Sequence, residues 1–152
     1  MPNTQAAKAY LRQYRGLLAR CKALSRAIQR AEEEATDVSV HLKPVSVQTS
    51  ASGDAMPNSV IRIVEATEQL QQEKARCESA LADVLAAINA VPDETQKAVL
   101  TMRYVEGLPW TEIQGQINYE RTQTLVIHGK ALQTVSAWLR QRADENGLLT
   151  DI

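Results

Sequence analysis

The sequence predicts an all-α protein, in which a long antiparallel coiled-coil helical hairpin is followed by a small helix-turn-helix module. Aromatic side chains make up only 4% of the 152 residues and Phe is absent, a composition typical of long helices rather than of a β-sandwich. Two regular heptad patterns precede residue 92, and short segments punctuated by Pro, Gly and Asn follow it. We therefore expect a hairpin over residues 1–91, a helix-turn-helix over 92–143 and a tail over 144–152.

The first helix is predicted over residues 4–36. Its apolar side chains recur at alternating spacings of three and four residues, which is the a/d seam of a coiled coil. The seam contains Ala7, Tyr10, Tyr14, Leu17, Cys21, Leu24, Ile28, Ala31 and Ala35.

The second helix is predicted to start after Pro57, with Asn58 or Ser59 capping its first amides, and to end at Pro92. Two of its seam positions, Thr67 and Lys74, are polar, and polar seam residues commonly specify the register of a coiled coil. The full seam contains Val60, Ile63, Thr67, Leu70, Lys74, Cys77, Leu81, Val84, Ile88 and Val91.

The connection between the two helices is predicted to cover residues 37–57, which is long for a compact domain. Its Pro and Gly residues favour a loop. A short β-like arm is the alternative, because apolar residues alternate at Val38, Val40, Leu42, Val45 and Val47.

Self-association is expected because a two-helix hairpin leaves apolar flanks uncovered. The flanking residues are Leu11, Leu18, Val64 and Leu85. We expect a homodimer or a higher oligomer that forms through the hairpin. The predicted oligomerisation residues are Tyr14, Leu17, Leu24, Leu70 and Leu81.

The module after residue 91 has the order helix, short helix, bend, helix. Pro92, Asp93 and Glu94 begin the first helix, and Gly107 ends it. The short helix follows Pro109, and Asn118 is expected to make the bend, because Asn tolerates positive φ. The last helix is predicted over residues 120–143, and its inward stripe contains Thr124, Ile127, Ala131, Val135 and Trp138.

Residues 91–132 resemble region 4 of bacterial sigma factors. The matching positions are Pro92, Val99-Leu100, Arg103-Tyr104, Gly107-Leu108, Trp110, Ile113 and Lys130-Ala131-Leu132. The chain departs from that pattern at Gln114-Gly115, where a small Ala is usual, and at Glu120, where Ser or Asp usually caps the recognition helix. The close crossing of the two helices would then have to be accommodated by Gly115 or be loosened.

The whole chain, with its opening "YLRQYR", Met56-Pro57 and the late "IHGKAL", is similar to small phage and prophage transcriptional regulators of the ArpU type. This resemblance implies sequence-specific binding to double-stranded DNA and control of phage or prophage genes, for which we expect the late genes. In that reading the helix over residues 120–143 enters the major groove.

The outward face of that helix supplies the predicted DNA contacts. Gln123 suits the edge of adenine, Val126 a thymine methyl group, and Thr122 either a base or a phosphate. The two cations suit guanine or phosphate. Leu125 is expected to lean toward the packed side. The DNA-binding residues are therefore Arg121, Thr122, Gln123, Val126 and Lys130.

Three neighbouring side chains are predicted to pack inside the module rather than to bind DNA. Tyr104, Trp110 and Trp138 fall on inward stripes. Arg103 is expected to pair with an acid such as Glu112, and His128 to pack at the edge of the groove.

The distribution of charge limits how strongly this chain can attract DNA. The formal net charge is −1, and residues 93–152 carry six basic and eight acidic side chains. Residues 1–36 carry seven Lys or Arg and three Glu. Phosphate contacts would have to come from a few placed cations, with the N-terminal helix as one source.

Several classes of protein are not expected. The sequence has no nucleophile–base pair, metal-ligand spacing or phosphate loop, so we expect no enzyme, no catalytic residues, no metal and no cofactor. Cys21 and Cys77 are isolated and are expected to be buried thiols. Because the chain has no apolar signal segment and no membrane span, we expect a cytoplasmic protein.

Two other functions compete with the reading of DNA. The module could dock on RNA polymerase without contacting DNA directly. Alternatively, the chain could be a small DNA-packaging subunit, a class that also joins a helix-turn-helix to an oligomerising helical part.

Overall fold

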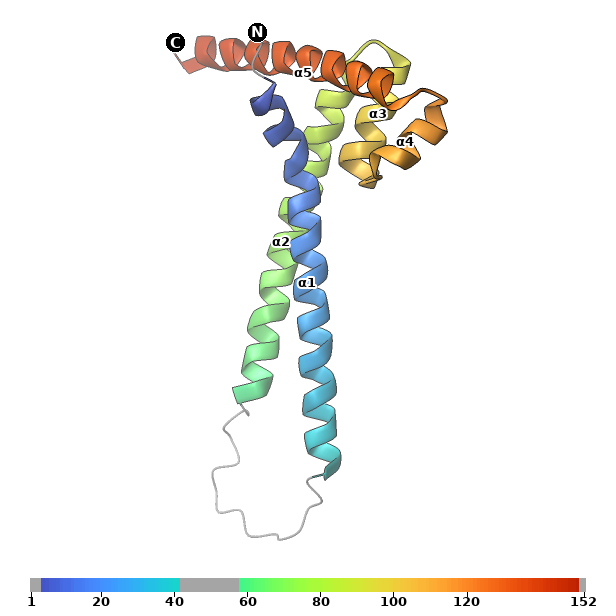
Figure 1. The fold of residues 1–152 in the computed structure, drawn as a ribbon. Coiled ribbons are helices and arrows are strands. Elements are labelled where there is room, and N and C mark those ends of the chain that lie inside the picture. Colours follow the sequence, from blue (N-terminus) through green and yellow to red (C-terminus); the bar gives the residue numbers. More distant parts are fainter. Residues whose placement is uncertain (1–3, 42–57, 151–152) are drawn as a thin grey trace, which may run out of the picture. The chain divides into compact units, whose positions relative to one another are not determined.

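The computed structural model describes residues 4–41 and 58–150, with side chains over 4–37 and 58–147. Every regular element in the described ranges is helical (Figure 1), which confirms the predicted all-α fold. The elements are α1 (Gln5–His41), α2 (Asn58–Asn89), α3 (Glu94–Thr101), the π-helix η1 (Met102–Glu106), α4 (Trp110–Ile117) and α5 (Arg121–Thr150). None of the described helices has an apolar stretch long enough to cross a membrane.

These helices divide into two compact units with boundaries inside α1 and α2. The unit called here the hairpin unit contains residues 18–76, and the unit called here the head contains residues 1–17 and 77–152. This division differs from the predicted boundary at residue 91, because the first turns of α1 and the last turns of α2 belong to the head. The predicted tail also differs, since α5 continues to Thr150.

Within the hairpin unit, α1 and α2 pair along the predicted seam. Cys21 and Ile28 are buried, and Ile63 and Leu70 are half-buried. The predicted polar seam residue Thr67 is half-buried, and its hydroxyl donates a hydrogen bond of 2.7 Å to the carbonyl oxygen of Ile63. The seam therefore follows the heptad spacing read from the sequence.

One seam position was predicted wrongly. Lys74 is exposed, and Glu73 is buried in its place, with only 7% of its side chain accessible. Leu70 and Cys77 are seven residues apart, so the seam position between them can lie three or four residues after Leu70. Glu73, three residues after Leu70, takes this position. Its carboxylate lies 3.7 Å from the Arg20 guanidinium of α1 and 3.3 Å from that of Arg76.

The connection is shorter than predicted at its start. Residues 37–41 belong to α1 rather than to a loop or a β-like arm. The rest of the predicted connection, residues 42–57, lies outside the described residues. At its other side, α2 begins at Asn58, so the helix starts directly after Pro57 as predicted, and both Asn58 and Ser59 lie within it.

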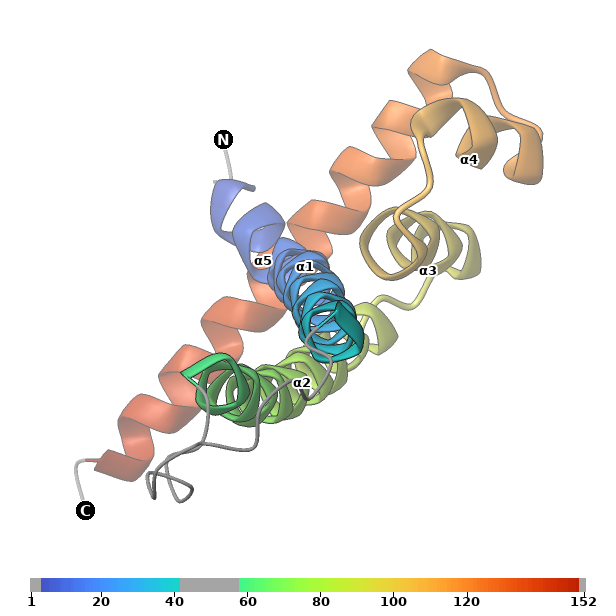
Figure 2. The same cartoon turned by 90° about the horizontal axis from the view of Figure 1, so that it is seen from below.

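The head is built around one core to which both long helices contribute. Figure 2 shows the first turns of α1 beside α5, where Ala7 and Leu11 pack with Ala131 and Leu132. Leu11 is fully buried, so the surface that covers this flank is the chain's own head rather than a second molecule. The buried core residues are Ala7, Leu11, Val84, Ala87, Ile88, Val91, Leu100, Tyr104, Ala131, Leu132 and Val135.

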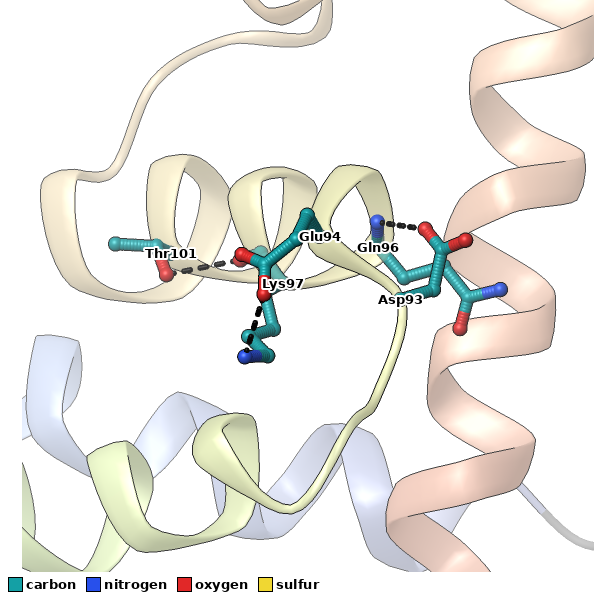
Figure 3. A network of polar contacts seen from close by, with 5 residues as sticks. All are labelled: Asp93, Glu94, Gln96, Lys97 and Thr101. Carbon is teal, nitrogen blue, oxygen red and sulfur yellow. Dashed lines mark hydrogen bonds and ion pairs between the residues drawn. The ribbon is translucent and has the colours of Figure 1, made fainter.

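The helix start predicted at Pro92-Asp93-Glu94 is confirmed: α3 begins at Glu94, and Asp93 caps it (Figure 3). The Asp93 carboxylate accepts a hydrogen bond of 2.9 Å from the amide of Gln96, and Glu94 forms an ion pair of 3.0 Å with Lys97. One turn later, the Thr101 hydroxyl donates to the carbonyl oxygen of Lys97 over 2.8 Å. These contacts satisfy polar groups where the chain turns from α2 into the module.

Candidate nucleic-acid interface

The bend between α4 and α5 has the geometry of a helix-turn-helix. Asn118 ends α4 with φ 59° and ψ 40°, which places it in the left-handed region, where Asn is favoured among residues other than Gly. The prediction of positive φ at Asn118 is confirmed.

A small apolar cluster supports this bend. Val99 of α3 and Met102 of η1 are buried together with Ile113 of α4. Ile127 of α5 packs on the same cluster. The four segments of the module are therefore held together by one cluster of apolar side chains, of which Met102 was not predicted to be inward.

Gly115 does not accommodate a close helix crossing, which was one of the two alternatives expected from the sequence. A Cβ atom built on this residue meets no atom within 4 Å. The crossing of α4 and α5 is therefore made without a close approach at Gly115, and the departure from the sigma pattern at Gln114-Gly115 creates no steric problem.

The structure brings the five predicted DNA-binding residues together on one exposed surface of α5. We call this surface the outer face. Its most exposed large apolar residue is Val126, at 51%. Contact with DNA stays a prediction. The outer face contains Arg121, Thr122, Gln123, Val126 and Lys130, each of which is exposed.

Leu125 was predicted wrongly, because it is 41% exposed rather than packed. The inward positions of this turn are occupied by Thr124, which is fully buried, and by His128. Successive residues of a helix are about 100° apart, so Leu125 follows Thr124 out of the packed side and lies next to Val126. The start of α5 therefore presents two adjacent apolar side chains to solvent.

A buried polar pair links η1 to α5 behind the outer face. The Tyr104 hydroxyl lies 2.8 Å from Nε2 of His128, and both side chains are buried. Burial, and then the nearby charges of Lys8, Arg103 and Arg12, lower the pKa of His128 to about 4. Burial also raises the pKa of Tyr104. At neutral pH the imidazole is therefore uncharged, and its tautomer decides which of the two groups donates the hydrogen bond.

The aromatic side chain of Trp110 packs against this pair. Its ring contacts the His128 ring edge-on, with 4.7 Å between the ring centroids. The predicted ion pair between Arg103 and Glu112 is absent from the described side chains. Arg103 instead lies 4.6 Å from the centroid of the Trp110 ring and donates a hydrogen bond of 3.1 Å to the carbonyl oxygen of Leu108.

Farther along α5, Trp138 is half-buried against the head core, as predicted for an inward aromatic residue. It meets Tyr10 of α1 edge-on at 6.2 Å between ring centroids. The Tyr10 hydroxyl donates to the carbonyl oxygen of Asp83 in α2 over 3.5 Å. These contacts attach α5 to α1 and α1 to α2 within the head.

The predicted oligomerisation residues are half-buried within the chain itself. Tyr14, Leu17 and Leu81 lie in the head, and Leu24 and Leu70 lie in the hairpin unit. The large apolar side chains that α2 leaves exposed are different ones: Ile61 at 39%, Val64 at 46% and Leu85 at 36%. Val64 and Leu85 were noted in the sequence as uncovered flanks, whereas Ile61 was missed.

Sequence reasoning also missed how residues far apart in the sequence meet in the head. The Tyr104–His128 hydrogen bond joins positions 24 residues apart, and no periodicity within one helix indicates such a pairing. The placement of Lys8 and Arg12 near His128 was missed for the same reason. The sequence did indicate that the start of α1 is strongly basic, since residues 1–31 contain no Asp or Glu.

Comparisons with known proteins gave no match to this chain among family models, curated proteins or solved structures. Among the described residues, no three His, Cys, Asp or Glu side chains lie close enough together to hold a metal ion.

Proposed function

We propose that the head is the DNA-binding module of a transcriptional regulator and that it reads the major groove with the outer face of α5. The observation that carries this proposal is the left-handed bend at Asn118, which joins two helices and leaves Arg121, Thr122 and Gln123 exposed at the start of the second. In helix-turn-helix proteins these first turns contact the base edges.

The chemistry of the outer face suits several base edges. Gln123 carries a donor and an acceptor that match adenine, and Arg121 or Lys130 matches guanine or a phosphate. Val126 and its neighbour Leu125 form an apolar pair for thymine methyl groups. The resemblance of residues 91–132 to sigma region 4, and of the chain to ArpU-type regulators, supports control of phage or prophage late genes.

The experiment that tests this proposal is selection of binding sites from random duplex DNA, followed by a mobility-shift assay on the selected site. Gln123→Ala should weaken binding about 5- to 150-fold, because a bidentate base contact contributes roughly 1 to 3 kcal/mol of discrimination. The matched control is Gln72→Ala, which removes an exposed amide from the hairpin unit and should leave binding unchanged. Failure to select any common sequence would overturn the proposal.

A second candidate function is docking on RNA polymerase, which is favoured by the exposure of Tyr119, Leu125 and Val126. An apolar surface of this kind suits a protein partner as well as thymine methyl groups. Replacing thymine by uracil in the selected site removes only the methyl groups. If Leu125 and Val126 read thymine, this replacement should weaken binding by the native protein but not by Val126→Ala with Leu125→Ala.

We also propose that the hairpin unit self-associates. Ile61 and Val64 are exposed on α2, near a shallow groove of about 190 Å³ lined by Ile28 and Ile63 with small Ala side chains. Ile61→Asp with Val64→Asp should lower the solution mass measured by light scattering to that of one chain. Glu65→Gln with Glu68→Gln is the control. A native protein that is already monomeric would contradict self-association.

A further inference from the structure

The first turns of α1 carry three cations on one face. Lys8, Arg12 and Arg15 are spaced by four and three residues, and side chains at these spacings lie one above the other on a helix. Like charges so placed repel one another. Because residues 1–31 contain no Asp or Glu, no acid in this part of the chain offsets the repulsion.

The packing of α1 into the head determines where this cationic face lies. Ala7 and Leu11 are fully buried, and each immediately precedes one of the cations in the sequence. Lys8 and Arg12 lie near enough to His128 of α5 to lower its pKa. The cationic face is therefore turned toward the helix that carries the outer face.

The third cation of this face, Arg15, lies beside the end of η1. Its guanidinium occupies the space that a Cβ atom on Gly107 would fill. Gly107 has φ 75°, a conformation that Gly adopts without the steric cost other residues incur. The absence of a side chain at this turn is what lets Arg15 approach the backbone.

A fourth cation comes from a distant part of the sequence. Arg103 of η1 acts electrostatically on both His128 and Tyr104, as Arg12 does. Its guanidinium is held by the carbonyl oxygen of Leu108 and the ring of Trp110, neither of which carries a negative charge.

Among the described side chains, none of these four cations forms an ion pair. The ion pairs in that part of the chain are Arg20–Glu73, Arg76–Glu73 and Lys97–Glu94. Four cations that converge without an ion-pair partner repel one another, and a bound anion would relieve this repulsion.

We propose that Lys8, Arg12, Arg15 and Arg103 form a phosphate-binding surface that contacts the sugar–phosphate backbone of double-stranded DNA. This inference rests on the proposed function. The surface would supply positive charge for phosphate contacts, because the outer face carries only two cations. Guanidinium groups bind phosphate oxygens in pairs, and each neutralised phosphate releases counterions from the duplex. The surface contributes affinity, whereas the outer face contributes sequence preference.

The test measures how DNA binding depends on salt. Fluorescence anisotropy with a labelled duplex is recorded between about 50 and 200 mM salt for the native protein and for Arg12→Gln with Arg15→Gln. The slope of log K against log salt should become shallower by about 1.8, because each lost phosphate contact contributes about 0.9. The preference for the selected site over random duplex should not change.

The matched control is Arg26→Gln with Arg30→Gln, which removes the same charge from exposed positions of the hairpin unit. It should leave the slope unchanged. Arg12→Gln alone, at an exposed position, is the second variant and should change the slope by about 0.9. Circular dichroism checks that each variant is folded.

The outcomes separate this inference from the proposed function. An unchanged slope for the double variant, or an equal change in the control, overturns the phosphate-binding surface even if specific binding persists. A changed slope with no preference for any sequence supports the surface and overturns sequence-specific reading. If the native protein binds no duplex at low salt, both proposals fail.

Discussion

The head and the hairpin unit differ in how fully they bury their own side chains. In the head, large apolar residues such as Leu11, Leu100 and Leu132 are almost completely buried, because five helical segments surround them. In the described part of the hairpin unit, Cys21, Ile28 and Glu73 reach the buried class, and one of them is a carboxylate. Two helices bury a narrower apolar surface than the several helices of the head, so fewer side chains of the hairpin unit are shielded from water within the chain itself.

The largest expected effect tests this difference in packing directly. Leu132→Ala in the head should lower the free energy of unfolding by about 2 to 5 kcal/mol, because it removes buried methyl groups and leaves a cavity. Leu24→Ala, at a half-buried position of the hairpin unit, should cost less than half as much. Urea unfolding followed by circular dichroism measures both. Equal losses would mean that the two units are packed equally well.

Acid should weaken the head through His128. The imidazole has a pKa of about 4 in the folded chain, against 6.5 in its ordinary environment. The unfolded chain therefore binds the proton more readily, and stability falls as the pH drops from 6.5 to 4, by about 3 kcal/mol at most. Below pH 4 both states are protonated and this loss does not grow further.

The measurement is urea unfolding at several pH values for the native protein and for His128→Gln. The variant should lack the part of the pH dependence between pH 6.5 and 4 that belongs to the imidazole, while the carboxylates of both proteins titrate alike. Identical pH profiles would show that the pKa of His128 is not lowered in the folded head.

A smaller effect is expected at the buried carboxylate of the hairpin unit. One oxygen of Glu73, Oε2, is buried without a hydrogen-bond partner, and the two arginines that approach the other oxygen are mostly exposed. Glu73→Leu should therefore raise the free energy of unfolding by about 1 kcal/mol or more, because a packed apolar side chain replaces an incompletely paired charge.

The control for this prediction is Glu68→Leu at an exposed position, which should change stability by less than about 0.5 kcal/mol. A destabilised Glu73→Leu variant would show that the ion pairs with Arg20 and Arg76 outweigh the cost of burying the carboxylate.

The smallest expected effect concerns Gly115 on the surface of α4. Gly115→Ala should stabilise the head by about 0.5 to 1 kcal/mol, because Ala favours the helix and its Cβ atom meets nothing within 4 Å. Gly107→Ala should do the opposite, since φ is 75° there and the new Cβ atom collides with Arg15. Thermal unfolding distinguishes the two, and a destabilised Gly115→Ala variant would indicate a close contact in solution.

Elements that depend on neighbours in the sequence were predicted well. The heptad seam of α1, the start of α3 next to Pro92 and Asp93, and the left-handed bend at Asn118 all follow from spacing or from the conformational preference of one residue. The packed side of α5 at Thr124, Ala131 and Val135 was predicted for the same reason.

Features that depend on distant segments were predicted less well. The heptad spacing leaves open whether Glu73 or Lys74 enters the seam, and the structure places Glu73 there, 3.7 Å from Arg20 of the other helix. Leu125 was expected to lean toward the packed side next to Thr124, but His128 is buried there and Leu125 is left exposed. Arg103 was assigned to a carboxylate because the position of the Trp110 ring was unknown.

By itself, the sequence determined the helices, the bend at Asn118 and the set of residues on the outer face of α5, because these follow from local periodicity and local conformational preference. Only the tertiary structure decided that the N-terminal turns of α1 belong to the head, that Tyr104 meets His128, and that Lys8, Arg12, Arg15 and Arg103 converge. The reason is physical: burial of Ala7 and Leu11 against α5 sets the position of α1, and periodicity within a single helix does not specify which surface will bury it.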